Sequence, residues 1–254
     1  VANGKTEWIK LNPGMEKAAA FLETHRYAAY LGASLGFTKM EGTTVNAKDK
    51  IAYSALQNIQ SSMVAGNAAN VPGNGISVPK QLVAGAVMAL NLKGGQKDTA
   101  GGTINSEWMP VDTKVLLAGE DITADALGNT ANPNNIANPD NLKFSEKMRT
   151  LFIGEDSSQH VNNFLWAYNV DTKQLSRVMS IPAGGESTGL HAVDEINGWT
   201  YIMSNFQHAG DWGAIHSVVK DTLDPMIKAN YKNKNGAAVG YLTAAAKQPS
   251  LNQA

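Results

Sequence analysis

One pattern occurs three times along this chain, and it constrains the possible folds more than any other feature. In each copy an acidic residue precedes a short run typical of a strand, a polar turn follows, and a second run centred on an aromatic residue comes next. The copies cover residues 41–55, 140–156 and 186–205. Short apolar runs separated by polar turns are typical of β-hairpins. The sequence therefore predicts a mainly β fold whose hairpins each begin at an acid.

A further hairpin is predicted at 164–179, between the second and third copies. Two hairpins make four strands, and Asp140 and Glu186 stand 46 positions apart, close to the roughly 40 to 50 residues of one β-propeller blade. We therefore predict a β-propeller. Since a propeller closes with about four to eight blades, the two or three predicted here make about half of a ring, and the missing half is the expected partner.

The segments outside the repeat have other compositions. Residues 14–35 are rich in Ala, Leu, Glu and Lys with apolar residues at helical spacing, which predicts one helix. The stretches 67–79 and 119–139 are rich in Gly, Asn and Pro, which predicts long loops inserted between strands. Residues 225–254 are expected to form an irregular or helical tail. We interpret 1–254 as a single domain.

Composition excludes several classes of function. The 254 residues have a formal net charge of −1 and only 17% are charged, so nucleic acid and anionic membranes are not expected partners. No apolar run reaches the about 18 residues that span a bilayer, so no membrane span is predicted. The sequence has no cysteine, which excludes thiol nucleophiles and thiolate ligands within it. The start at Val1 indicates processing, either to a mature secreted form or to a proteolytic piece.

The repeated acids are the first candidates for chemistry. In a propeller the inner strand of each blade begins beside the central channel, so Glu41, Asp140 and Glu186 are expected to converge there. Clustered carboxylates favour a hard cation, and Ca²⁺ binds about six to eight oxygen ligands. The alternative is that Glu186, Asp140 and the neighbouring Asn141 only make turn hydrogen bonds before strands. Both interpretations are open at this point.

A second group of oxygen ligands follows the strand of the second copy. Glu155 and Asp156 run into a segment with His160 and the amides at 162–163. Adjacent acids, a histidine and two amides supply many ligands in a small space, so this segment is a metal-site candidate. The alternative is a polar loop that caps the hairpin, with His160 bonded to the backbone.

Three cationic residues are candidates for binding an anionic substrate. Lys39 stands two positions before Glu41, so both point to the same face of an extended strand, an arrangement that suits a phosphate ester; a surface salt bridge is the alternative. Arg26, in the predicted helix, is either a second phosphate ligand or solvated. His208 is either a general acid or a turn histidine packed on Trp212. No Gly-x-Ser-x-Gly motif or phosphate-binding glycine loop is present.

Several of these segments, taken in order, resemble the second half of the PhoX-type alkaline phosphatases. The resemblance extends from about residue 23 to about residue 210. The motifs that carry it are FTKMEG at 37–42, NPDNL at 138–142, GED at 154–156 with HVNN at 160–163, and Thr188-Gly189 followed by NFQHAG at 205–210.

The resemblance implies a six-bladed propeller that is periplasmic or secreted. It also implies that the axis holds Ca²⁺ and Fe³⁺, and that these ions bind and hydrolyse phosphate monoesters. By this likeness Glu41 is a bridging metal ligand and, with Lys39, a catalytic residue. Lys39 stands where the family has a phosphate-binding arginine, and lysine makes a point-charge contact instead of a bidentate one. The family's iron site includes a cysteine from the first half of the chain, whereas this chain has none.

The resulting prediction is a metal-dependent phosphatase that needs its N-terminal half. The predicted metal ligands are Glu41, Asp140, Asn141, Glu155, Asp156 and Glu186, and the predicted substrate-binding residues are Lys39, Arg26 and His208. Two other functions remain open. One is a non-catalytic, calcium-stabilised propeller that acts as a binding or scaffold module. The other is a propeller lactonase or esterase, which acts on carbon esters.

Overall fold

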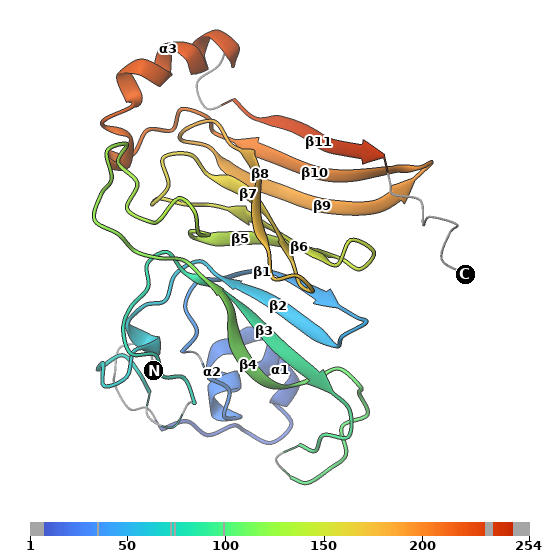
Figure 1. Ribbon diagram of the computed structural model, residues 1–254. Coiled ribbons are helices and arrows are strands. Elements are labelled where there is room, and N and C mark those ends of the chain that lie inside the picture. Colours follow the sequence, from blue (N-terminus) through green and yellow to red (C-terminus); the bar gives the residue numbers. More distant parts are fainter. Residues whose placement is uncertain are drawn as a thin grey trace. The chain divides into compact units, whose positions relative to one another are not determined.

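A computed structural model describes residues 8–34, 36–71, 73, 75–98, 100–231 and 236–245. Whereas the sequence suggested a single domain, the contacts divide the chain into two compact units. The first contains residues 1–39 and 59–82, and the second contains residues 40–58 and 83–254. The units are described separately below (Figure 1). Among the described residues, no helix has the length and apolarity to cross a membrane.

The first unit carries two short helices, where the sequence predicted one helix over 14–35. They are α1 (Glu16–Leu22) and α2 (Thr24–Tyr30), and neither contains a buried residue. The break falls where the Thr24 hydroxyl donates a hydrogen bond to the Ala20 carbonyl at 2.8 Å, a side-chain contact that competes with the helical backbone pattern. Gly32, with φ of 90°, follows the end of α2. A 3₁₀ turn, η1 (Ser61–Met63), completes the regular structure of this unit.

The second unit consists mainly of three antiparallel sheets, so the expected mainly β fold is confirmed. The sheets follow one another along the chain, and in each one the strands pair in sequence order. The first contains β1 (Met40–Asn46), β2 (Ile51–Leu56), β3 (Ala86–Lys93) and β4 (Met109–Ala118). The second contains β5 (Pro139–Ser145), β6 (Thr150–Glu155), β7 (Phe164–Asn169) and β8 (Leu175–Ser180). The third contains β9 (Glu186–Ile196), β10 (Trp199–Gln207) and β11 (Ala238–Ala245).

The predicted hairpins are all present, as β1–β2, β5–β6, β7–β8 and β9–β10. The three hairpins that begin at an acid open the three sheets. Their first strands lie in contact, β1 with β5 and β5 with β9. The 67–79 and 119–139 stretches lie between strands, as predicted, the first between β2 and β3 and the second between β4 and β5.

Apolar side chains between the sheets form the core. One cluster joins Tyr53 and Val87 of the first sheet to Leu142, Leu151 and Trp166 of the second. Another joins the second sheet to the third through side chains of β6, β7, β9 and β10. Burial of these side chains, at roughly 25 cal/mol per Å² of apolar surface, fixes the sheets against each other and so fixes the positions of their strand ends.

The tail differs from the irregular or helical segment predicted for 225–254. A helix, α3 (Lys220–Asn230), contains Pro225 in its interior, and β11 then pairs with β10 over its whole length. The apolar and β-branched residues of β11 gain backbone hydrogen bonds from a strand more than thirty residues earlier, which composition alone does not reveal. Residues 232–235 and 246–254 of the predicted tail lie outside the described residues.

Candidate functional site

The backbone has the same special conformation before each of the three repeated acids. Two positions before Glu41, Asp140 and Glu186 stands a residue in the left-handed region. These residues are Lys39 (φ 45°), Asn138 (φ 45°) and Gly184 (φ 76°). Such conformations are uncommon outside glycine, so their recurrence indicates that the three strand entries are built alike and present the acids equivalently.

Two of the acids also lie at β-bulges. The pairing of β1 with β2 shifts register between Met40 and Thr43, and that of β5 with β6 shifts between Pro139 and Leu142. Glu41 and Asp140 therefore occupy matching places in the two hairpins. Bulges bend a strand and redirect side chains, and they are frequent beside active sites. The third hairpin differs, because Glu186 pairs directly with Gln207.

Glycines allow neighbouring sheets to approach each other at these acids. A Cβ on Gly42 would lie 2.4 Å from the carbonyl oxygen of Asp140, and one on Gly154 would lie 3.0 Å from that of Ser187. The first separation is too short for any Cβ atom, and the second is tighter than most Cβ contacts. The bulge of β1 therefore lies against the backbone of β5 beside Asp140, and the end of β6 lies against β9 beside Glu186.

Three carboxylates from different segments interact at this end of the sheets. The pKa of Glu186 is raised to about 7, first by burial, then by a hydrogen bond and the negative charge of Asp156 and by the charge of Asp140, while His208 lowers it. Like charges at close range disfavour ionisation. Asp140, Asp156 and Glu186, which the sequence predicted as ligands, therefore form one acidic cluster.

Polar side chains surround this acidic cluster. Gln57 donates hydrogen bonds to Oδ2 and the carbonyl of Asp156, at 2.8 and 3.2 Å, and Gln207 donates one to Glu186. The Nδ1 of His208 donates to the Gly184 carbonyl at 2.9 Å, which leaves Nε2 facing Glu186 at 3.6 Å. Separately, Asn141 Nδ2 donates to Asp140 Oδ1 at 2.6 Å.

Sequence reasoning missed Gln57, although a signal for it existed. Gln57, Asp156 and His208 each directly follow the second strand of a hairpin that begins at an acid, namely β2, β6 and β10. Roles were predicted for Asp156 and His208, which are ionisable, and none for Gln57, which is a neutral amide. The position in the repeat, and not the residue type, was the signal.

The acidic cluster fits calcium in kind but supplies only part of a coordination shell. Its donors are carboxylate oxygens, which hard cations prefer, and a cation would relieve the repulsion that raises the pKa of Glu186. In the described ranges, however, no three or more histidine, aspartate or glutamate side chains are grouped so as to hold a metal ion. The thiolate that the resemblance implies for iron has no counterpart, since the sequence has no cysteine.

Glu155 lies apart from the cluster, in contrast to its predicted role as a ligand. Its carboxylate is fully buried and accepts hydrogen bonds from the backbone amides of Ala137 and Phe164, from the Trp166 indole and from His160. Four protein donors occupy both oxygens, so none remains for a cation. The strand alternation that turns Asp156 toward the cluster turns Glu155 into the interior.

The remaining residues predicted for the site are Glu41, Lys39 and Arg26. Glu41 is half-buried at the bulge of β1. Lys39 and Arg26 belong to the first unit, so their part in the site stays a prediction. The Nε of Arg26 lies 3.8 Å from Glu23 Oε2, and both side chains are exposed.

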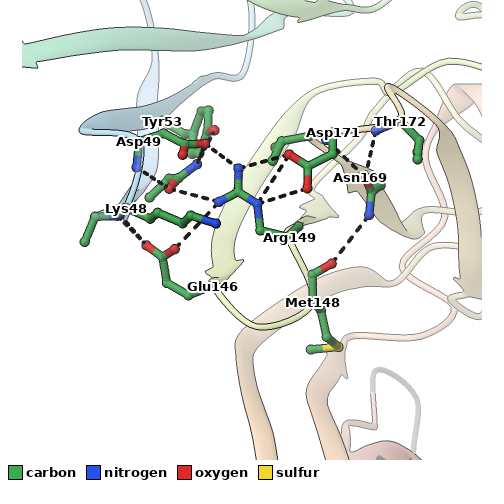
Figure 2. Close-up of polar contacts among 12 residues, drawn as sticks. Lys48, Asp49, Tyr53, Glu146, Met148, Arg149, Asn169, Asp171 and Thr172 are labelled. Atoms are coloured by element: carbon green, nitrogen blue, oxygen red, sulfur yellow. Dashed lines mark hydrogen bonds and ion pairs between the residues drawn. The ribbon is translucent and has the colours of Figure 1, made fainter. Parts of the chain in front are cut away.

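The opposite ends of the hairpins carry a second ionic group, shown in Figure 2. Arg149, in the β5–β6 turn, pairs with Asp49, with Asp171 at 3.0 Å and with Glu146 at 3.8 Å. Hydrogen bonds from Arg149 lower the pKa values of Asp49 and Asp171. Arg149 is the shared cationic partner of all three carboxylates, so this group ties three turns together and favours the ionised form of its two aspartates.

A cavity of about 660 Å³ lies in the first unit, lined by residues between 65 and 77 that are all uncharged. It brings no ionisable group together, so the acidic cluster remains the candidate site. Comparisons of the chain with protein-family models, with curated proteins and with solved structures found no match.

Proposed function

We propose that this chain is the C-terminal part of a β-propeller phosphatase of the PhoX type, which hydrolyses phosphate monoesters with the help of calcium. The observation that carries the proposal is that Asp140 and Asp156, which come from different segments, interact with Glu186, whose pKa burial and these carboxylates raise to about 7. Such an arrangement is costly in the absence of a cation. Asp140 and Glu186 lie at strand entries and Asp156 directly follows β6, so all three stand at the same end of the hairpins.

The order of the sheets supports the propeller in this proposal. Three antiparallel sheets follow one another along the chain. The first strand of each sheet contacts the first strand of the next sheet. Blades of a propeller are four-stranded sheets set around a central channel. Further blades would come from the N-terminal half of the protein, which we propose as the partner, in a periplasmic or secreted setting.

Each residue of the cluster has a definite task in this proposal. Asp140, Asp156 and Glu186 would hold calcium, with Glu41 as a further ligand from β1. Bound calcium supplies neutralisation of the ester's charge and activation of an oxygen nucleophile. His208 is oriented by its Nδ1 hydrogen bond to Gly184, and in this proposal the Nε2 of the doubly protonated ring gives a proton to the leaving oxygen. Lys39 is proposed to contact the phosphate, and bound Fe³⁺ remains part of the resemblance alone.

The test is a phosphatase assay of the complete protein with a chromogenic phosphate monoester. Activity is measured with calcium, after removal of metal by a chelator, and after calcium is restored. We expect activity that is lost on chelation and recovered with calcium, and calcium retained in elemental analysis. The variant Glu186→Gln removes one ligand charge and is expected to lower activity by at least tenfold, while Arg149→Met at the opposite strand ends serves as the matched control.

Three outcomes would contradict the proposal in different ways. Calcium binding without turnover of any ester would indicate the scaffold function. Hydrolysis of lactones or carboxylic esters in place of phosphate esters would indicate the esterase function. Absence of both calcium binding and hydrolysis in the complete protein would remove the proposed site altogether.

A further inference from the structure

A pair of fully buried ionisable side chains lies directly behind the acidic cluster and has no part in the function proposed above. Glu155 and His160 are both 0% exposed, and Glu155 Oε2 lies 3.0 Å from His160 Nδ1. Carboxylates are almost never fully buried unless they are paired. A buried pair of this kind can often be replaced by apolar side chains without loss of stability, so its presence calls for a reason other than stability.

The hydrogen bonds hold both members from several sides. Glu155 Oε1 accepts from the Ala137 amide at 2.9 Å and from the Trp166 indole at 2.6 Å, while Oε2 accepts from the Phe164 amide at 3.0 Å. The Nε2 of His160 lies 3.2 Å from the carbonyl oxygen of Asn132. Both ring nitrogens of His160 therefore lie within hydrogen-bond distance of an oxygen, which fixes the orientation of the ring.

The partners of this pair lie on segments that carry the acidic cluster. The Ala137 amide belongs to the segment that enters β5, three residues before Asp140, and Glu155 directly precedes Asp156. Asn132 lies in the same long connection between β4 and β5. The pair thus binds this connection to the end of β6 through buried hydrogen bonds.

Asn138 makes a second link between the same two segments. It is buried and adopts a left-handed conformation. Its side chain donates to the Gln57 carbonyl at 2.8 Å and accepts from the Ser157 hydroxyl at 2.8 Å. The Asp156 amide also donates to the Asn138 carbonyl at 3.2 Å, so Asn138, two positions before Asp140, holds both Asp156 and the residue that follows it.

We propose that the hydrogen-bonded Glu155–His160 pair is a positioning element that sets the separation of Asp140 and Asp156 and so shapes the calcium site. The inference rests on the proposed function for its purpose, and on the buried hydrogen bonds for its geometry. Glu155 touches neither substrate nor metal in this arrangement. It acts through the backbone of the two segments that it joins.

The test compares Glu155→Gln with Leu151→Ala in the complete protein, well below the unfolding temperature of either variant. The glutamine has nearly the same shape but presents an amide group to donors that need an acceptor. Leu151 is buried at the turn end of β6, so its truncation destabilises the protein away from the site. Calcium titration calorimetry is expected to give an affinity about 10- to 100-fold lower for Glu155→Gln, as for other residues that support metal ligands, and an unchanged affinity for Leu151→Ala.

A second measurement does not depend on metal binding. In metal-free protein, carboxyl NMR titration is expected to show the pKa of Glu186 falling from about 7 in Glu155→Gln, because Asp156 and Asp140 move away from it. Leu151→Ala should leave this pKa unchanged. If Glu155→Gln does not fold, His160→Asn replaces it, since three donors to Glu155 then remain.

The outcomes separate this inference from the proposed function. An unchanged Glu186 pKa and an unchanged calcium affinity in the Glu155 or His160 variant would overturn the positioning role. A wild-type protein that binds no calcium but shows the Glu186 shift in the variant would overturn the proposed function and support the positioning role.

Discussion

The two ends of the hairpins treat negative charge in opposite ways. At the turn end, Arg149 contacts Asp49, Asp171 and Glu146, and the pKa values of the two aspartates are lowered by its hydrogen bonds. At the entry end, burial and the neighbouring carboxylate of Asp156 raise the pKa of Glu186 to about 7. The turn end is therefore an ionic group in which one arginine favours ionisation of the aspartates, whereas at the entry end burial and neighbouring carboxylates disfavour ionisation of Glu186.

This difference teaches where to look for function in such a fold. Both ends contain clustered acids, and the sequence pattern alone does not separate them. Acids that accept hydrogen bonds from an arginine hold turns together. Acids whose pKa is raised, and that are held in place by glycine contacts and buried hydrogen bonds, are candidates for binding a cation. The following predictions test that difference, beginning with the largest expected effect.

The buried pair behind the entry end should have the largest effect on stability. Glu155→Ala leaves His160 and three further buried donors without their acceptor, and breaking a buried pair costs about 3 to 5 kcal/mol. Urea denaturation monitored by tryptophan fluorescence measures the loss. Replacing both Glu155 and His160 by leucine should recover only the part due to the unpaired histidine, because the other three donors still lack an acceptor. A double variant as unstable as the single one would show that the histidine is not the cause.

The pH dependence of stability should come next in size. The folded pKa of Glu186 is raised from 4.5 to about 7, so the folded state binds more protons than the unfolded state between these values. Metal-free protein should therefore lose stability as pH rises from 4.5 to 7, by up to about 3 kcal/mol, since one pKa unit corresponds to about 1.4 kcal/mol.

The control for this prediction is Glu186→Gln, which should lack that part of the pH dependence in melting curves recorded at pH 5 and pH 8. Calcium should restore the stability of the wild type at pH 8 and have a smaller effect on the variant. Equal pH profiles for the two proteins would mean that Glu186 does not titrate in this range.

A substitution at Gly42 should distort the entry end without changing its charge. An added Cβ meets the Asp140 carbonyl at 2.4 Å, and overpacking of this kind costs about 1 to 3 kcal/mol. Gly42→Ala is therefore expected to lower both stability and calcium affinity, as measured by thermal melting and calorimetry. Gly240→Ala, at a glycine with open space around it, is the matched control.

The smallest effect on stability is expected at the turn end. Arg149→Met removes the cation of the turn group, whose members are partly exposed, so the loss of stability should be below about 1 kcal/mol and should shrink as salt is raised. Phosphatase activity should be unchanged. A tenfold loss of activity in this variant would mean that the two ends are not independent.

The hairpins could be predicted from the sequence because their signals are local. Alternating apolar and polar residues, aromatic-centred runs and polar turns lie within a few positions of each other, and the strand bounds follow them closely. The acids at the entries were found in the same way. The single helix predicted over 14–35 is correct only in part, because two short helices form there. The hydrogen bond from the Thr24 hydroxyl to Ala20 competes with the helix at its centre.

The failures share a physical cause, which is that long-range contacts decide them. The strand β11 gains its hydrogen bonds from β10, far away in the sequence. Glu155 and Asp156 are adjacent acids of the same chemistry, yet one is surrounded by four donors and the other interacts with Glu186. Gln57 enters the site only because the sheets bring the ends of β2 and β6 together.

The sequence by itself determined that this chain forms acid-led hairpins, because strand and turn preferences act between near neighbours. Only the tertiary structure decided which acids have raised and which have lowered pKa values, because burial and distance set the cost of ionisation. Asp49 and Glu186 look equivalent in composition, and it is the packing of whole sheets that places an arginine beside the first and two carboxylates beside the second.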